Sequence, residues 1–307
     1  MTIFAMVSTK DSLEYTELAI ESFFKETNLE DNSKFILIDN DGSIKQSNLP
    51  HKEKIELIVN KVPLGFSANA NQSIDQALVS NSDLYFLNND VIFTKNWYEI
   101  LKACPSNIVC TPLCNREVEY VASVSNVRKN SIVTALHCAP PPFSLNHYMG
   151  KSAHLNAIVE AHQIAVKGLF PVLHVPFFCV KIPSFVLKVV GKFDEEYGQG
   201  GGEDFDYCLR CYLADCSIAY AASSFMLHFG GKSTYESESE KNRQALRESH
   251  FRKVFLNKWG QELYDLTMNE DASILDRRPE LKAMMDQNKI SDFVKTLVGS
   301  REVKIHL

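Results

Sequence analysis

The sequence has no long basic stretch, no charge-free apolar stretch and no recognisable secretion signal. Lys and Arg number 32 against 38 Asp and Glu, which gives a formal net charge of −6 and argues against nucleic-acid binding. The most apolar stretch, residues 168–191, contains His174, two lysines and three prolines, so it is not expected to span a membrane. The first residues, MTIFAMVSTKDS, lack the basic start and the cleavage site of a signal peptide. We therefore expect a cytoplasmic protein.

The motifs of several large enzyme classes are also missing. The chain contains no Gly-x-Ser-x-Gly, Walker A or Gly-x-Gly-x-x-Gly pattern, which excludes the commonest hydrolase, kinase and dinucleotide-binding sites. In the absence of a signal peptide, we expect its eight cysteines to be reduced. The pairs Cys110/Cys114 and Cys208/Cys211 have spacings compatible with a zinc site. Because the second pair is expected on a helix face, small apolar core residues are the favoured interpretation.

The first half of the chain alternates short apolar runs with helical patterns. A chain of 307 residues with 45% apolar residues is long enough for one large domain or two small ones. The alternation predicts an α/β fold with a mainly parallel sheet. We expect strands over residues 3–8, 35–39, 55–60, 83–87 and 107–111, and helices over about 11–25, 67–79 and 95–101, with Asp11 and Ser67 as helix caps.

The second half is less regular. We expect a loop and then a helix from about Ala153, a strand over 177–182, and a short helix that Pro183 begins and Gly191 ends. A helix is expected to begin at Glu203-Asp204, followed by a strand over 217–222. The chain becomes helical and charged from Tyr235 and is weakly patterned towards its end.

Polar residues cluster directly after three of the predicted strands, where an α/β sheet binds its ligand. Asp39, Asn40 and Asp41 could accept hydrogen bonds from a nucleobase or a ribose, or could simply make a turn. The same two interpretations apply to the segment Asn88-Asn89-Asp90. A carboxylate there could bind Mg²⁺ or Mn²⁺ together with phosphate oxygens and water.

Three further residue groups are suited to chemistry. Glu203 and Asp204 begin a helix after three glycines, where a carboxylate is stabilised by the helix dipole and could also act as a general base. His228 follows a strand and could complete a metal site with Asp90, although a single histidine is more often structural. Lys232, in the loop GGKS, could bind phosphate together with backbone N–H groups.

Taken in order, these segments resemble glycosyltransferase family 2, in particular its rhamnosyltransferase-like branch, which has the GT-A fold. The resemblance begins with the strand that ends at Ser8-Thr9, the segments FILIDNDGS and NKVPLGFSANANQSID, and the strand LYFLNNDV. It continues, in the order that is typical of the family, with VVGKFDEEYGQGGGEDFDYCLRC, HFGGKST and FRKVFLNKWG. The resemblance covers about residues 3 to 260. Its specificity comes from the order of the segments rather than from any one of them.

The resemblance implies a GT-A catalytic domain over residues 1–235: a Rossmann-like, mainly parallel sheet flanked by helices. Its nucleotide-sugar half would cover about 1–115 and its acceptor half about 116–235, with residues 236–307 packed on it as a helical C-terminal extension. The implied activity is inverting sugar transfer from a UDP- or dTDP-sugar to a hydroxyl of a glycan or lipid-linked glycan. We expect the acceptor near residues 137–167 and 200–202. A peripheral position at the inner face of a membrane is compatible with this activity.

The resemblance also implies roles for individual residues. Asp39 would hold the nucleobase, and Asp204, beside Glu203, would take the proton from the acceptor hydroxyl. Asp90 and His228 would hold Mn²⁺ or Mg²⁺ against the diphosphate. The expected donor-binding residues are Ser8, Thr9, Asp39, Asn40, Asp41, Gly65, Phe66, Asn71, Asn88, Asn89 and Lys232.

The sequence departs from the family pattern at three positions. Pro63 stands where the family often has Asn, Ser73 where it often has Gly, and Asn88 replaces the first carboxylate of the metal motif. Two other functions remain open at this point. A nucleotidyltransferase would normally have a glycine-rich loop after the first strand, which VSTKDSLEY lacks. A catalytically silent nucleotide-sugar-binding module would have no need of Asp204.

Overall fold

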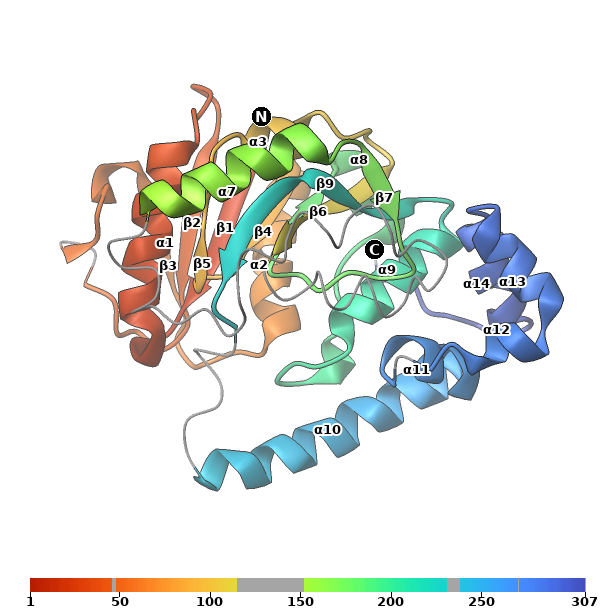
Figure 1. The fold of residues 1–307 in the computed structure, drawn as a ribbon. Helices are drawn as coiled ribbons and strands as arrows, with labels where there is room; N and C mark the ends of the chain where they lie inside the picture. Colours follow the sequence, from red (N-terminus) through yellow and green to blue (C-terminus); the bar gives the residue numbers. More distant parts are fainter. Residues whose placement is uncertain (46–47, 115–151, 231–237, 270, 307) are drawn as a thin grey trace.

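The computed structural model describes residues 1–45, 48–114, 152–230, 238–269 and 271–306. Within these residues, nine strands form one mixed sheet in the order β3-β2-β1-β4-β8-β6-β9-β5, with β7 paired to β9 (Figure 1). The strands are β1 (Thr2–Ser8), β2 (Lys34–Asp39), β3 (Ile55–Val59), β4 (Asp83–Leu87), β5 (Val91–Ile92), β6 (Ile108–Cys114), β7 (Leu169–Pro171), β8 (Cys179–Ile182) and β9 (Ser217–His228).

Helices cover both faces of this sheet. Alternate residues of the strands, such as Phe4 and Ala5 in β1, enter two separate hydrophobic clusters. Helices α1 and α3 contribute to one cluster, and α2, α8, α9 and α14 to the other. The described α-helices are α1 (Leu13–Glu26), α2 (Phe66–Val79), α3 (Trp97–Lys102), α7 (Ser152–Ala165), α8 (Ser184–Val190), α9 (Glu203–Leu213), α10 (Glu238–Trp259), α11 (Gln261–Thr267), α12 (Ser273–Arg277), α13 (Pro279–Asp286) and α14 (Ile290–Val298).

The strands β1 to β4 pair in parallel and therefore end at the same edge of the sheet. In this register Ser8 lies beside Asp39, and Asp39 lies beside Val59. The predicted strand–helix alternation is confirmed over this half. Beyond β4, the strand β8 runs antiparallel to both β4 and β6, which makes the whole sheet mixed.

Some boundaries differ from those expected from the sequence. Asp11 lies inside a short 3-10 turn (Lys10–Ser12), and α1 begins after it. Helix α2 begins at Phe66 after Gly65, so Ser67 lies inside the helix with a buried side chain rather than capping it. Strand β9 extends six residues past the predicted end and finishes at His228. The extended end of β9 pairs with β5, and His228 lies opposite Val91 in this pair.

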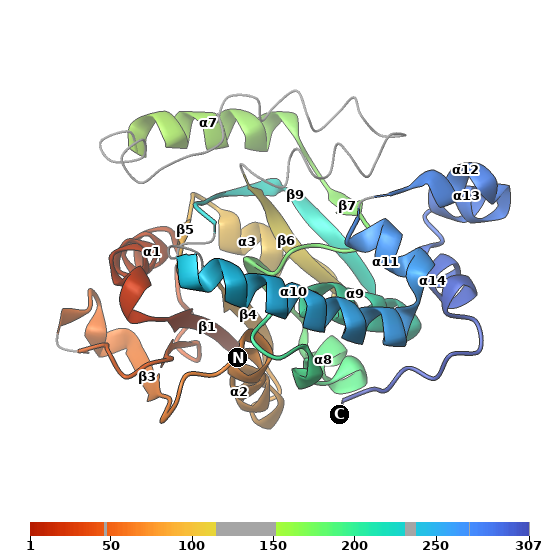
Figure 2. The same ribbon diagram turned by 90° about the horizontal axis from the view of Figure 1, so that it is seen from below.

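The C-terminal segment forms a series of helices as far as Val298, including the part with the weak sequence pattern, and then ends in a non-helical stretch in which His306 bridges to Gly191. Figures 1 and 2 show α10 as a long helix along one side of the fold, with α11 to α14 gathered beyond its end. Helix α14 buries Phe293, Val294 and Leu297 in the cluster that contains α9. Its strongly amphipathic sequence is therefore explained by intramolecular packing. Among the described helices, none is both long and apolar enough to cross a membrane.

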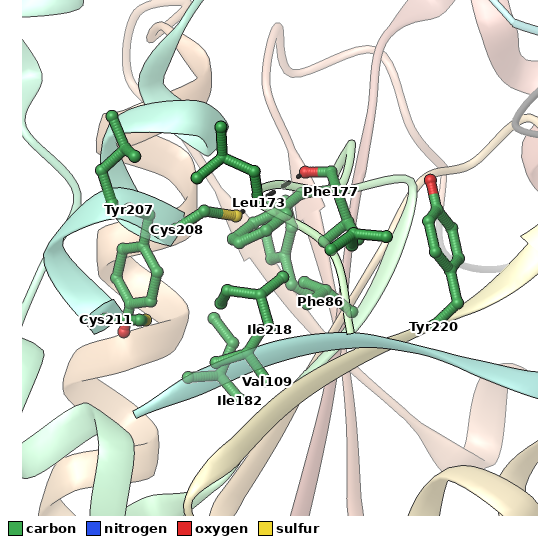
Figure 3. Close-up of a cluster of buried hydrophobic side chains, with 14 of the residues drawn as sticks. Phe86, Val109, Leu173, Phe177, Ile182, Tyr207, Cys208, Cys211, Ile218 and Tyr220 are labelled. Carbon is green, nitrogen blue, oxygen red and sulfur yellow. Dashed lines mark hydrogen bonds between the residues drawn. The ribbon is translucent and has the colours of Figure 1, made fainter. Parts of the chain in front are cut away.

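The cysteine pairs lie in different parts of the core. Cys208 and Cys211 project from α9 into the apolar cluster over β6 and β9 (Figure 3). Cys110 and Cys114, on β6, belong to the cluster on the other face of the sheet. The sheet separates the two pairs, so the four thiols do not form one zinc site, and each contributes to the core as a small apolar residue.

Candidate functional site

A cavity of about 450 Å³, which we call the strand-edge cavity, lies where β1, β2 and β4 end. It combines a polar rim with apolar side chains such as Phe177 and Phe178, as small-molecule sites commonly do. Nine of the residues singled out in the sequence line it: Thr9, Asn40, Phe66, Asn88, Asn89, Asp90, Glu203, Asp204 and His228. Residues more than 200 positions apart in the sequence, such as Thr9 and His228, thus meet at the edge of the sheet predicted to bind a ligand.

Asp90 and His228 come together through the pairing of β5 with β9. Val91 lies opposite His228 in this antiparallel pair, and the His228 Nε2 atom is 3.3 Å from the Asp90 Oδ1 atom. The His228 ring also stacks on Phe178, with ring centroids 5.0 Å apart. Both polar side chains are largely buried.

This pair fits a divalent cation that shares its ligands with a phosphate group. A carboxylate oxygen and an imidazole nitrogen are both ligands that Mn²⁺ accepts. The described residues contain no group of three metal-binding side chains. The pair therefore suits a cation whose remaining positions are taken by phosphate oxygens and water, which is the arrangement expected from the sequence.

Glu203 and Asp204 form a carboxylate pair at the start of α9. The Gly201 N–H donates to the Glu203 carboxylate, and the Phe205 N–H donates to Asp204 at 2.9 Å. Burial, together with the neighbouring Asp204 carboxylate, raises the pKa of Glu203 to about 8. Burial also raises the pKa of Asp204 to about 6. At neutral pH Asp204 is therefore mostly ionised and able to accept a proton, whereas Glu203 mostly keeps its own.

Asp39 and Asp41 organise the turn after β2 and do not line the cavity. Asp39 is fully buried, and its carboxylate accepts the backbone N–H groups of Asp41, Ser43 and Ile44 at 3.3, 3.2 and 2.9 Å. The Asp41 carboxylate accepts the Lys10 N–H at 2.9 Å and joins this turn to the end of β1.

Asn40 lines the cavity and also belongs to a buried amide network. Its Oδ1 atom accepts from Asn60, Asn69 and the Leu64 N–H at 2.8 to 3.1 Å. Its own amide donates to the Leu64 carbonyl at 3.1 Å. The network fixes the segment before α2 against the end of β2, so this wall of the cavity is held by the chain itself.

Two further hydrogen bonds fix the start of α1 beside the cavity. The Asn89 amide donates to the Ser12 and Thr16 hydroxyls at 2.6 and 2.9 Å. Ser8, which is buried and does not line the cavity, bonds to Thr16 at 2.6 Å. Thr9, Asn88 and Asn89 line the cavity at these two strand ends.

Asn71 and Gly65 hold the loop that precedes Glu203 and do not themselves line the cavity. The Asn71 amide donates to the Phe193 carbonyl and to Glu195, and its oxygen accepts the Phe193 N–H. A Cβ atom on Gly65 would lie 2.1 Å from the Gly198 carbonyl oxygen. The absence of a side chain at Gly65 therefore lets this loop close over α2.

Replacing Gly65 with alanine is expected to lower the melting temperature by several degrees, because the new methyl group forces two backbones apart at a cost of roughly 1–3 kcal/mol. Differential scanning calorimetry measures this loss. Gly168 is a matched control because a Cβ there meets no atom within 4 Å, although its φ of +87° adds local strain. A smaller loss in Gly65→Ala than in Gly168→Ala would contradict the close-approach explanation.

Three polar residues that line the cavity were not identified from the sequence: Asn69, Gln199 and Arg247. Arg247 comes from α10, in the segment that the resemblance assigns to a C-terminal extension. Arg247 precedes Phe251 by four residues, so both side chains lie on one face of the helix. This spacing is the sequence signal that could have pointed to Arg247. Lys232 and residues 137–151, part of the expected acceptor region, lie outside the described residues.

The FRKVFLNKWG segment meets the loop before α9 through a buried charge cluster. Asp206, which is fully buried, accepts Arg210 Nε at 2.8 Å and the Trp259 indole N–H at 2.9 Å. Lys258 lies 2.8 Å from Asp206 and 2.7 Å from Asp194. These contacts attach α10 to the segment that carries Glu203 and Asp204.

No protein-family model matches this chain, and no curated protein matches its sequence. Its structure is similar to the crystal structure of GalNAc-T7 with UDP, GalNAc and Mn²⁺, with a TM-score of 0.58 and 12% identity. That match covers 98% of this chain but 56% of the other, so the present chain spans little more than half of that protein. The mannosyltransferase PcManGT from Pyrobaculum calidifontis, in complex with GDP-Man and Mn²⁺, matches with a TM-score of 0.52 and 9% identity over 99% of this chain and 76% of the other. These likenesses confirm the predicted GT-A fold.

Proposed function

We propose that this protein is an inverting glycosyltransferase that moves a sugar from a nucleotide-diphosphate donor to a hydroxyl group of a glycan or lipid-linked glycan. The observation that carries the proposal is the strand-edge cavity, which brings Asp90 and His228 together with the Asp204 carboxylate. The two structures of similar fold were solved with UDP and with GDP-Man, which supports a nucleotide-sugar ligand. The order of the sequence segments supports membership of glycosyltransferase family 2, in its rhamnosyltransferase-like branch.

In this proposal the donor lies across the carboxyl ends of β1, β2 and β4. The base lies near the turn after β2, where the buried Asp39 holds the backbone and Asn40 faces the cavity. The Asp39 carboxylate already accepts backbone N–H groups of the turn. We therefore propose that Asp39 positions the base indirectly, by fixing the backbone of the turn that the base contacts. Thr9 and Asn88 bind the ribose side, with UDP or dTDP as the preferred nucleotide.

Asp90 and His228 would hold Mn²⁺ or Mg²⁺ against the diphosphate. When bound, such a cation stabilises the negative charge that grows on the leaving diphosphate. Arg247 lines the same cavity and supplies a fixed positive charge to the phosphates from α10. Lys232 is proposed to add a second one.

Asp204 accepts the proton of the acceptor hydroxyl as that oxygen attacks the anomeric carbon. One displacement on the face opposite the leaving group inverts the configuration. The pKa of about 6 for Asp204 suits this role, because a general base works best when its pKa lies near the working pH. Glu203, mostly protonated at neutral pH, leaves the negative charge of the pair on Asp204.

The first experiment measures the thermal stability of the protein with UDP, dTDP, GDP and CMP, each with and without Mn²⁺. We expect a diphosphate, UDP or dTDP, to raise the melting temperature more with Mn²⁺ than without it, since a ligand at 100 times its Kd stabilises by about 2.7 kcal/mol. In Asp90→Asn the additional rise in melting temperature that Mn²⁺ causes should disappear. Asp215→Asn is the matched control, because the Asp215 side chain is 72% exposed and precedes the start of β9, whereas His228 stands at the other end of that strand. No response of the wild type to any nucleotide would overturn the proposal.

A further inference from the structure

A second cavity, of about 420 Å³, lies between the start of α9 and helix α10. We call it the α10 cavity. It shares Phe66, Gln199, Glu203, Asp204 and Arg247 with the strand-edge cavity, so the two form neighbouring lobes. Asp204 therefore lines both the strand-edge cavity, where we place the donor, and the α10 cavity. A ligand in the α10 cavity would present its groups to the proposed base.

The walls of the α10 cavity combine aromatic surface with charge. Phe205 comes from α9, Phe251 from α10, and Met268 follows α11. Glu248 and Arg247 add one charge of each sign from the same turn of α10. The loop 200–202 completes the lining with its backbone, which can both donate and accept hydrogen bonds.

The glycine loop sets the position of the Phe251 ring. A Cβ atom on Gly201 would lie 2.4 Å from Phe251 Cδ1, so the ring rests directly on the backbone at this residue. Gly201 has a φ of +126°, which side-chain-bearing residues rarely adopt. The absence of a side chain at Gly201 therefore allows the Phe251 ring to pack directly against the loop backbone. The ring remains partly exposed.

Helix α10 is held firmly enough to position such a wall. His250 Nε2 donates to the Glu196 carbonyl at 2.7 Å. Lys258 and Trp259 bond to the buried Asp206 carboxylate two turns further along. These anchors lie on both sides of Phe251 along the helix face that meets the α9 loop.

We propose that the α10 cavity is the acceptor subsite and that it binds a pyranose ring laid against Phe251, with one hydroxyl directed to Asp204. This proposal rests on the proposed glycosyl transfer. A pyranose has a face of C–H groups that suits an aromatic ring and an edge of hydroxyls that suits Glu248, Arg247 and the loop backbone. The negative charges of Asp204 and Glu248 disfavour a second nucleotide or phosphate there. The charged residues equally disfavour an acyl chain.

The test is saturation-transfer NMR with methyl glycosides of glucose, galactose, rhamnose and N-acetylglucosamine, with a serine-containing peptide as the competing class of acceptor. Each probe is measured with and without UDP and Mn²⁺. We expect at least one glycoside to bind the wild type. Phe251→Leu, which keeps an apolar side chain but removes the flat ring, should weaken that binding by at least about tenfold. Leu246→Ala is the control, because Leu246 is 73% exposed on α10 and does not line the cavity.

Three results would overturn the acceptor-subsite proposal: no glycoside binds, only the peptide binds, or glycoside binding is unchanged in Phe251→Leu. A folding defect is recognised separately from the melting temperature and from the UDP response of the variant, which should match the wild type. If Phe251→Leu does not fold, Glu248→Ala on the same wall serves as the test, with the same tenfold weakening expected. A wild type that binds glycosides but no nucleotide would count against glycosyl transfer and not against the sugar subsite.

Discussion

Asp204→Asn is expected to lower the rate of sugar transfer by roughly 10²- to 10⁴-fold, the range that general-base catalysis contributes. Asparagine has nearly the same size and shape as aspartate, but its amide cannot take the proton from the acceptor hydroxyl. The dissociation constant for UDP should stay within about twofold of the wild type, because the diphosphate is assigned to Asp90, His228 and Arg247. Transfer is measured as sugar appearing on the acceptor, and UDP binding by calorimetry.

Two variants make this result specific to Asp204. In Glu203→Gln the loss should be smaller, because Glu203 is already mostly protonated at neutral pH and accepts the Gly201 N–H. Asp215→Asn, which removes an exposed carboxylate paired with Lys295, should transfer at the wild-type rate. A large loss in Glu203→Gln combined with full activity in Asp204→Asn would reverse the roles of the two carboxylates.

The pH dependence gives a second readout of the same assignment. The base is active when it is ionised, so kcat/KM of the wild type should rise with pH through the region around the Asp204 pKa of about 6. The rise belongs to the Glu203–Asp204 pair as a whole. In Asp204→Asn the remaining activity should lose this rise. A wild-type profile that is flat between about pH 5 and 7 would exclude Asp204 as the base.

The sequence was sufficient for the parallel half of the fold because its strands are uninterrupted apolar runs. In FILID and DLYFL every position except the charged ends enters a core cluster, and such runs are typical of strands buried on both faces. The polar residues after these runs could be placed at one edge because parallel strands end together. Thr9, Asn40 and Asn88 consequently line one cavity.

Other features depend on contacts that local sequence does not encode. Asp39, Asn71 and Gly65 belong to recognisable motifs, yet their side chains or backbone hold loops instead of lining the cavity. A motif match identifies the residue but does not distinguish a ligand contact from a partner within the chain. The role of α10 was missed for a related reason, since its polar sequence gives no sign that Arg247 and Glu248 face a cavity. That arrangement depends on pairing with residues about 50 positions earlier.

Asp206→Ala is expected to destabilise the fold by about 3–5 kcal/mol, the usual cost of removing one partner from a buried ion pair. The Asp206 carboxylate is fully buried between Arg210 and Lys258, each 2.8 Å away, and it also accepts the Trp259 indole N–H. Alanine leaves two buried cations without their shared counter-charge. The melting temperature should fall by roughly 10 °C, on a scale of 2–4 °C per kcal/mol for a large domain.

The matched comparison is Asp215→Asn, which removes the charge that pairs with Lys295 and suits the left-handed backbone at this position, where φ is +55°. An exposed pair of this kind contributes about 0–1 kcal/mol, so its melting temperature should stay within about 3 °C of the wild type. Equal losses in the two variants would mean that the cluster contributes no more than a surface pair. The expected difference arises from solvent, because water replaces the lost partner of Lys295 but does not reach Arg210. Since Asp206 joins the helix that begins at Glu203 to the helix that carries Phe251, the same substitution should also loosen the α10 cavity while leaving the β1–β4 sheet intact.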